Sequence, residues 1–178
     1  MNRFLPILGI ATILIAEAAA FAYAIIPDVS PTYRAVLIDR TTACIPKPAS
    51  GTFRSGTPIV LDRSGDRAAF DALNVCGFAD PRSDGTATIG PEARLRLRHS
   101  TPVTLTIEAR SVSDGPRIVN VAGRRIEVPQ DFTAVTVPLA APPDGVTELE
   151  LRTETPEGTT GARWRGILIR SLRIDAAQ

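Results

Sequence analysis

Hydrophobic positions in this chain follow two patterns, one at its start and one over its second half. Residues 4–26 are almost entirely apolar, a run of 23 residues that ends at Pro27-Asp28. A helix of that length reaches about 34 Å, enough to cross the hydrocarbon core of a bilayer. From residue 86 onward, apolar and polar residues alternate with period two, which is typical of antiparallel strands with one buried face. The chain therefore predicts one membrane span followed by β-structure.

The apolar run has two interpretations that the sequence leaves open. An uncleaved signal anchor is favoured because the run continues past the small-residue sites at 18–20 and 22–24 to residue 26. A cleaved secretory signal peptide is the other interpretation. In both, Arg3 and the amino terminus lie in the cytoplasm, since positive charge stays inside. The remaining chain is then periplasmic, on a single-pass protein of a bacterial inner membrane.

Glu17 and three alanines suggest a helix contact inside this run. A central acidic residue costs about 2.5–3.5 kcal/mol on insertion. One explanation is a protonated glutamate tolerated in lipid or removed with a signal peptide. The other is a polar contact with a partner helix. Ala16, Ala20 and Ala24 recur every fourth residue and form a smooth ridge for close helix packing. This pattern predicts integral membrane subunits as partners, with membrane lipid around the helix.

The soluble part predicts many short strands. Alternation runs through four segments, and two more flank Ala122-Gly123, a candidate hairpin turn. These segments are residues 93–98, 103–110, 135–139 and 148–152, with 119–121 and 126–128 around the turn. The more apolar run 166–174 predicts a central strand or one with a bulge. Eight or nine strands of this kind favour an antiparallel β-sandwich of the jelly-roll type.

Three further elements precede these strands. Residues 35–39 predict a first strand, residues 41–57 predict a long irregular loop, and Asp66 caps a short helix that ends at Leu73. The predicted organisation is therefore a transmembrane anchor over 1–27, a linker over 28–34 and an all-β domain over 35–178.

Composition narrows the chemistry. The net charge of +1 gives no reason to expect nucleic acid as a partner. The two cysteines, Cys44 and Cys76, predict a disulfide in an extracytoplasmic domain. A bridge of that span stabilises a fold by about 3–4 kcal/mol in the chain-entropy model. A metal site needs more ligands than these two, and the single histidine, His99, is far away in sequence.

Motifs for catalysis are weak throughout. His99 follows three arginines at a strand end and is interpreted as a surface residue. Asp80, Asp84 and Gly85 predict a turn, with a structural calcium as the less favoured alternative. The glutamates 148, 150 and 154 lie close together, but 148 and 150 alternate with leucines and belong to a solvated face. The sequence therefore predicts neither an enzyme nor a cofactor.

A family resemblance rests on loose motifs spread over residues 74–174. These are Cys76-Gly77-Phe78, Asp84-Gly85-Thr86, Gly90 and the segments 93–97, 119–123 and 166–169. They resemble the galactose-binding-like, carbohydrate-binding-module-like jelly rolls attached to bacterial envelope and polysaccharide-assembly membrane proteins. The resemblance implies a jelly-roll fold and, more weakly, sugar binding.

Two groups of basic residues are candidate contact surfaces. Arg94, Arg96 and Arg98 point one way from a single strand. They either pair across strands with glutamates at 108, 127 or 150, or form a docking face for an anionic partner. Trp164 lies between Arg163 and Arg165 and either plugs the end of the sandwich or anchors a partner or sugar ring.

Two functions follow from these observations. The leading hypothesis is a non-enzymatic accessory or scaffold subunit, anchored by one helix, whose sandwich docks on a membrane protein complex. The alternative is an extracytoplasmic carbohydrate-binding module that recognises a cell-surface glycan in envelope polysaccharide assembly.

Overall fold

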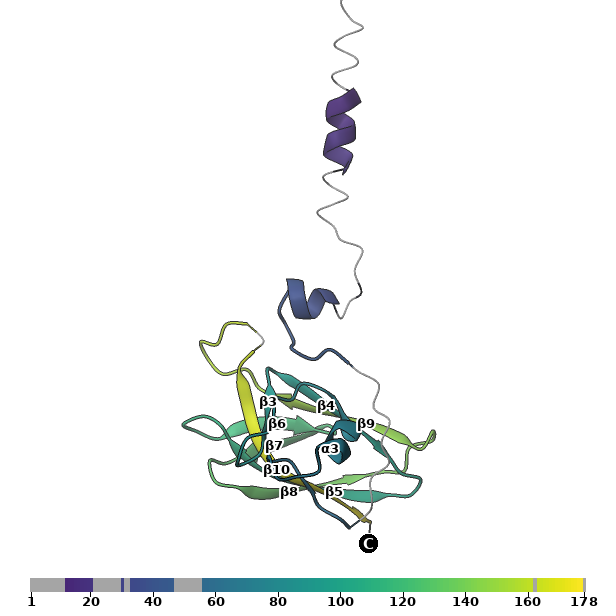
Figure 1. The fold of residues 1–178 in the computed structure, drawn as a ribbon, viewed down its shortest axis with the longest axis vertical. Helices are drawn as coiled ribbons and strands as arrows, with labels where there is room; N and C mark the ends of the chain where they lie inside the picture. The colour runs from purple at the N-terminus through teal and green to yellow at the C-terminus, as the bar shows by residue number, and fades with distance from the viewer. Residues whose placement is uncertain (1–11, 21–29, 31–32, 47–55, 162, 178) are drawn as a thin grey trace, which may run out of the picture. The chain divides into compact units, whose positions relative to one another are not determined.

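A computed structural model describes residues 12–20, 30, 33–46, 56–161 and 163–177 (Figure 1). By internal contacts the chain divides into two units, residues 1–31 and residues 32–178. The first unit contains a helix over residues 12–20, in which Ile13, Leu14 and Ile15 are exposed. No helix within the described residues has both the length and the apolar character that crossing a bilayer requires. The predicted span runs beyond them on both sides. Ala16, Glu17 and Ala20 lie in the helical stretch, and Ala24 lies outside the described residues.

The second unit is a β-sandwich, as the alternation predicts. Its described residues form two five-stranded antiparallel sheets, ordered β1-β10-β5-β8 with β3 also paired to β10, and β2-β4-β9-β6-β7. The strands are β1 (Ile59–Val60), β2 (Asn74–Cys76), β3 (Thr86–Ile89), β4 (Glu92–Arg98), β5 (Val103–Ser111), β6 (Arg117–Val121), β7 (Arg124–Val128), β8 (Thr133–Leu139), β9 (Val146–Thr153) and β10 (Arg165–Ala176). From β3 to β10 the chain changes sheet at every connection except the β6–β7 hairpin.

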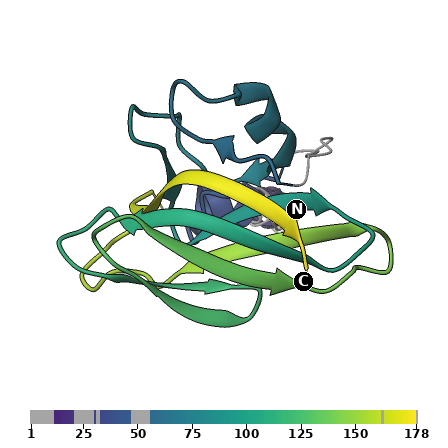
Figure 2. The ribbon, with the colours of Figure 1, turned by 90° about the horizontal axis from the view of Figure 1, so that it is seen from below.

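One apolar core fills the space between the sheets. Leu95, Leu97, Leu105 and Leu149 are at most 1% exposed. Fully burying a side chain of this size contributes about 1.5–3 kcal/mol. A short helix, α3 (Arg67–Leu73), adds Phe70 and Leu73 to the same core. It contacts β1 in one sheet and β2 and β4 in the other, so it packs where the two sheets begin (Figure 2).

Several local predictions are confirmed. The Asp66 carboxylate accepts a hydrogen bond from the Ala69 amide at 3.0 Å, which caps α3. Strands β6 and β7 form the predicted hairpin, with Ala122 and Gly123 both at positive φ, 49° and 76°. This conformation suits the right-handed twist of the two strands. Strand β10 pairs on both sides and shifts register between Ile169 and Ser171, as a central strand with a bulge.

Two predictions are wrong. Residues 35–39 are not a strand: residues 35–38 belong to a π-helical turn, η1 (Arg34–Ile38), and Asp39 caps its end. The Asp39 amide donates to the Arg34 carbonyl at 2.8 Å. An isolated strand leaves its backbone groups without partners, whereas this turn pairs them internally.

His99 is the second wrong prediction, because it is only 9% exposed. Its position shares the parity of Leu95 and Leu97, so period-two geometry turns it inward. Its Nδ1 lies 2.9 Å from the Thr101 carbonyl oxygen, and its Nε2 lies 2.8 Å from Thr147 Oγ1. A carbonyl oxygen can only accept, so Nδ1 carries a proton. His99 thus ties the β4–β5 turn to β9 and is not available as a surface base.

The predicted disulfide is confirmed. Cys44 and Cys76 are bonded, with their Cα atoms 4.9 Å apart and a sequence separation of 32. Both side chains are buried next to Val75. In the described part of the predicted 41–57 loop, residues 41–46 form neither helix nor strand. The bridge therefore attaches the irregular segment that follows η1 to strand β2.

Candidate ligand-binding cleft

A cleft of about 450 Å³ lies between η1 with the residues that follow it and the loop that connects β9 to β10. We call it the Arg40/Arg163 cleft. Its lining consists of Val36, Leu37, Arg40, Thr42, Thr160, Gly161 and Arg163. This volume is within the range of clefts that hold small ligands, about 300–1,000 Å³. All seven residues belong to the sandwich unit.

The first wall of the cleft is held by η1 and the disulfide. Val36 is 8% exposed and roots the turn, while the Thr41 amide donates to the Ala35 carbonyl at 2.8 Å. Thr42 Oγ1 donates to the Glu92 carboxylate at 3.4 Å, close to the bridged Cys44. Covalent and hydrogen-bonded contacts thus fix this segment against strands β2 and β4.

Arg40 has an uncommon backbone conformation. Its φ of 52° lies in the left-handed region, which costs a non-glycine residue free energy. Such outliers are found often at ligand sites, where the surrounding structure holds them. Here the conformation follows the last turn of η1 and brings the Arg40 side chain to the cleft.

The second wall is the end of the β9–β10 loop. Gly161 has a φ of 80°, a conformation that glycine adopts without strain. Beyond Arg163, the Trp164 carbonyl accepts a hydrogen bond from the Gly90 amide at 2.6 Å. This bond fixes the loop to the turn between β3 and β4 just before β10 begins.

The electrostatic character of the cleft is positive. Its lining holds two guanidinium groups, two threonine hydroxyls and no carboxylate. Within the described residues, neither Arg40 nor Arg163 has an ion-pair partner. Guanidinium groups bind carboxylate and phosphate oxygens through paired hydrogen bonds, and hydroxyl groups both donate and accept. The lining therefore suits a ligand with an anionic group and neighbouring hydroxyls.

The predicted Trp164 group divides in the structure. Arg163 lines the cleft, whereas Trp164 and Arg165 do not. Trp164 is half-buried, and its indole Nε1 is buried without a hydrogen-bond acceptor among the described residues. This burial favours the interpretation of Trp164 as a plug at the end of the sandwich. Arg165 is exposed at the first position of β10.

Sequence reasoning missed the rest of the cleft. Arg40, Thr42 and Thr160 carry no motif, and Arg40 lies far from Arg163 in sequence. The predicted disulfide was the one usable signal, because it attaches the segment around residue 44 to the sandwich.

The arginine ladder is paired, but with other glutamates than the three predicted. Arg94 and Arg96 contact Glu148 at 2.9 and 3.0 Å, and Arg94 also contacts Glu92. The hydrogen bond from Arg96, followed by that from Arg94, holds the pKa of Glu148 below its usual value. Arg98 is exposed and makes no ion pair with the described residues.

The predicted partners of the ladder lie elsewhere for geometric reasons. Glu108 belongs to the other sheet, where it pairs with Arg170 at 3.2 Å. Glu150 stands opposite Arg94 in the register, but its carboxylate pairs with Arg152 at 2.7 Å. Most charge on the ladder is thus neutralised within the sheet, and a docking role for this face stays a prediction.

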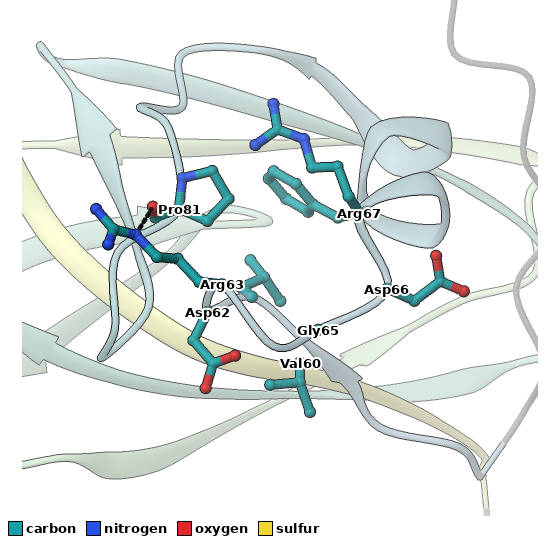
Figure 3. A pocket seen from close by; sticks show the side chains of 9 residues that line it. Val60, Asp62, Arg63, Gly65, Asp66, Arg67 and Pro81 are labelled. Carbon is teal, nitrogen blue, oxygen red and sulfur yellow. Dashed lines mark hydrogen bonds between the residues drawn. The ribbon is translucent and has the colours of Figure 1, made fainter.

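A second pocket, of about 230 Å³, lies between β1, the start of α3 and Pro81 (Figure 3). Its charged rim is occupied by internal contacts. Arg63 Nε donates to the Pro81 carbonyl at 3.5 Å, and Arg67 pairs with Asp71 at 3.0 Å. Hydrogen bonds from Ser64 lower the pKa of Asp62. With these groups engaged, the pocket is a weaker candidate than the Arg40/Arg163 cleft.

The candidate calcium loop is bound to arginines. Asp84 pairs with Arg110 at 3.0 Å, and Asp80 lies 3.9 Å from Arg67. Within the described residues, no group of three or more histidine, cysteine, aspartate or glutamate side chains could hold a metal ion. Gly85 has a φ of 141°, and a Cβ there would lie 2.4 Å from the Ile169 carbonyl oxygen. Glycine is required at this turn because the β10 backbone passes so close.

Comparisons with known proteins give structural similarity only. No family model matches the chain, and no curated protein matches it. Among solved structures, the sandwich is similar to Xyl-CBM35 in complex with a glucuronic acid containing disaccharide (16% identity, TM-score 0.36, 75% of this chain and 93% of that one). It is also similar to the CBM35 of Abf62 from Cellvibrio japonicus (16% identity, TM-score 0.34, 74% and 93%). A third is the C-terminal CBM6 of a marine laminarinase from Zobellia galactanivorans (20% identity, TM-score 0.31, 51% and 77%). These structures are carbohydrate-binding modules, but at these identities and TM-scores the likeness carries no conclusion about what this chain binds.

Proposed function

We propose that this chain is a non-catalytic binding protein whose jelly-roll domain recognises an acidic saccharide in the Arg40/Arg163 cleft. The observation that carries the proposal is the pair of guanidinium groups in one cleft whose lining contains no carboxylate. The strand orders β3-β10-β5-β8 and β4-β9-β6-β7 support the jelly-roll assignment, since the chain from β3 to β10 changes sheet at every connection except the β6–β7 hairpin.

The chemistry of the lining supports an acidic sugar over a neutral one. A uronic acid or a phosphorylated sugar offers an anionic group for Arg40 and Arg163, and a hydroxyl for Thr160. The Thr42 hydroxyl is already bonded to the Glu92 carboxylate and the Cys44 amide. Leu37, which is 47% exposed, supplies apolar contact for the C–H face of a sugar ring. A charge-assisted hydrogen bond of this kind contributes about 1.5–3 kcal/mol.

Calorimetric titration of the full-length protein with glucuronic acid oligosaccharides tests this proposal. Arg163→Gln removes one cationic group from the cleft, while Arg165→Gln removes an exposed arginine two residues away that does not line it. We expect Arg163→Gln to weaken binding by about 10- to 100-fold, from the same 1.5–3 kcal/mol. Arg165→Gln should bind like the unmodified protein. Equal losses in both variants, or binding of neutral oligosaccharides with the same affinity, would contradict the proposal.

A membrane-anchored accessory subunit is the second candidate. Its support is the helix over residues 12–20, which carries Ala16, Glu17 and Ala20 together with exposed isoleucine and leucine side chains. The Cys44–Cys76 bridge supports an oxidising compartment such as the periplasm. Purification in gentle detergent with mass spectrometry tests this candidate. Loss of co-purifying membrane subunits in Glu17→Leu or Ala20→Phe is the expected result, and unchanged partners in both variants would contradict it.

A further inference from the structure

Large apolar side chains are exposed together on the segment that leads into the sandwich. Tyr33 is 49% exposed, Leu37 47%, Ile38 45% and Ile45 59%. We call these four residues the apolar turn. Six large apolar side chains are exposed in the described chain after residue 30, and these four are the most exposed of them. The other two are Val60 at 36% and Val112 at 37%. Single exposed apolar residues need no explanation, but a group confined to one short segment marks an interaction surface.

The geometry of η1 explains why three of these residues share a face. Hydrogen bonds in a π-helical turn join residues five apart, so residue 38 follows residue 33 by one turn and residue 37 lies beside it. Val36 is instead directed inward and is 8% exposed. The disulfide at Cys44 holds the next residue, Ile45, to the sandwich. The apolar turn is therefore displayed by a structured segment rooted in the domain.

We propose that the apolar turn inserts into the interface of the lipid bilayer that residues 4–26 are predicted to cross. Residue 33 follows residue 26 by seven peptide units, which span at most about 25 Å. In a chain whose residues 4–26 cross the bilayer, residue 33 therefore lies within about 25 Å of the end of the span. Arg34 and Arg40 are exposed within the same segment, against one exposed carboxylate at Asp39, so its net positive charge complements anionic headgroups. Tyrosine at a membrane–water interface and apolar side chains just below it are the usual composition of such contacts.

The proposal does not depend on saccharide binding. It does add a consequence, because Leu37 both belongs to the apolar turn and lines the Arg40/Arg163 cleft. Arg40 is shared in the same way, so bilayer insertion and saccharide binding compete for these two side chains.

Fluorescence quenching in vesicles tests the insertion. The full-length protein is reconstituted into vesicles of phosphatidylcholine and phosphatidylglycerol that carry brominated acyl chains. Leu37→Trp places an additional indole in the apolar turn. Ser100→Trp places one in the exposed turn after β4, at the opposite end of that strand from Gly90 and Trp164. The emission of the unmodified protein, which contains Trp164 alone, is subtracted from both. Ile45→Trp is a second probe of the turn if Leu37→Trp fails to fold.

We expect the added emission of Leu37→Trp to shift to the blue and to be quenched by brominated lipid. The added emission of Ser100→Trp should keep its wavelength and intensity. Equal emission of both variants in brominated and plain vesicles would overturn the proposal. Failure of the protein to partition into the vesicles would also overturn it. So would a blue shift of the added Leu37→Trp emission that is seen only in native membranes, since a protein partner would then cover the turn.

Discussion

Removal of the Cys44–Cys76 disulfide should lower both the stability of the fold and the affinity for ligand, because this bond cross-links the domain and also holds one wall of the Arg40/Arg163 cleft. The perturbation is Cys44→Ala combined with Cys76→Ala, which avoids placing hydroxyl groups at two positions that are 4% and 6% exposed. The bond closes a loop with a sequence separation of 32 residues. The chain-entropy relation for a loop of that length gives about 3.7 kcal/mol at 25 °C. This is a large part of the total stability of an ordinary domain, about 5–15 kcal/mol.

Urea unfolding of the full-length protein in detergent, followed by Trp164 emission, measures the change. With a denaturant slope of about 2 kcal/mol per molar, the midpoint should fall by about 2 M. The same variant should bind acidic oligosaccharide more weakly even where it is fully folded. Without the bond, the described contacts that hold the Arg40 wall to the sandwich are the burial of Val36 and the hydrogen bond from Thr42 to Glu92. An unchanged midpoint, or unchanged affinity in the folded variant, would refute the reasoning that the bridge builds the cleft.

Two further predictions follow from single side chains. Asp66→Ala removes the cap on the Ala69 amide, so the free energy of unfolding should fall by about 1 kcal/mol in urea titrations, and a loss within error of zero would contradict the capping role. Hydrogen bonds from Arg96 and Arg94 hold the pKa of Glu148 in the folded protein below its value in the unfolded chain. The pairing therefore stabilises the fold fully at pH values above the unfolded-state pKa, and this stabilisation is lost as the pH falls through the folded-state pKa. Glu148→Gln should therefore lower stability slightly at neutral pH and flatten its decline in acid, and parallel pH profiles of variant and unmodified protein would exclude this role.

The sequence predicted which side chains of each strand face the core. Leu95, Leu97 and Leu105 are buried as their alternation predicts, and the same rule applied to residue 99 gives the burial of His99. The error there came from reading the three preceding arginines as a sign of exposure. Alternation is a strong signal because a strand has only two faces, whereas neighbouring charge says nothing about the direction of the next side chain.

The start of the domain and the cleft were much less readable. Residues 35–39 have the composition of a strand, but no strand among the described residues pairs with them, and a π-helical turn forms over residues 34–38 instead. Arg40 and Arg163 come together through the disulfide, the conformation of η1 and the β9–β10 loop. Sequence patterns indicate local periodicity and do not predict which loops far apart in the sequence lie side by side. Glu148 rather than Glu150 contacts Arg94 for a related reason, since side-chain direction decides between two nearby carboxylates.

Mapping a bound acidic saccharide on the protein tests the central claim most directly. The full-length protein is labelled with ¹⁵N, reconstituted in lipid nanodiscs and titrated with a glucuronic acid oligosaccharide while amide and guanidinium signals are followed by NMR. The account predicts saturable shifts at Arg40, Thr42, Thr160, Gly161 and Arg163, with the ladder of Arg94 and Arg96 unaffected. Saturable shifts confined to the ladder or to the pocket around Pro81, or no shifts at any oligosaccharide concentration, would contradict it.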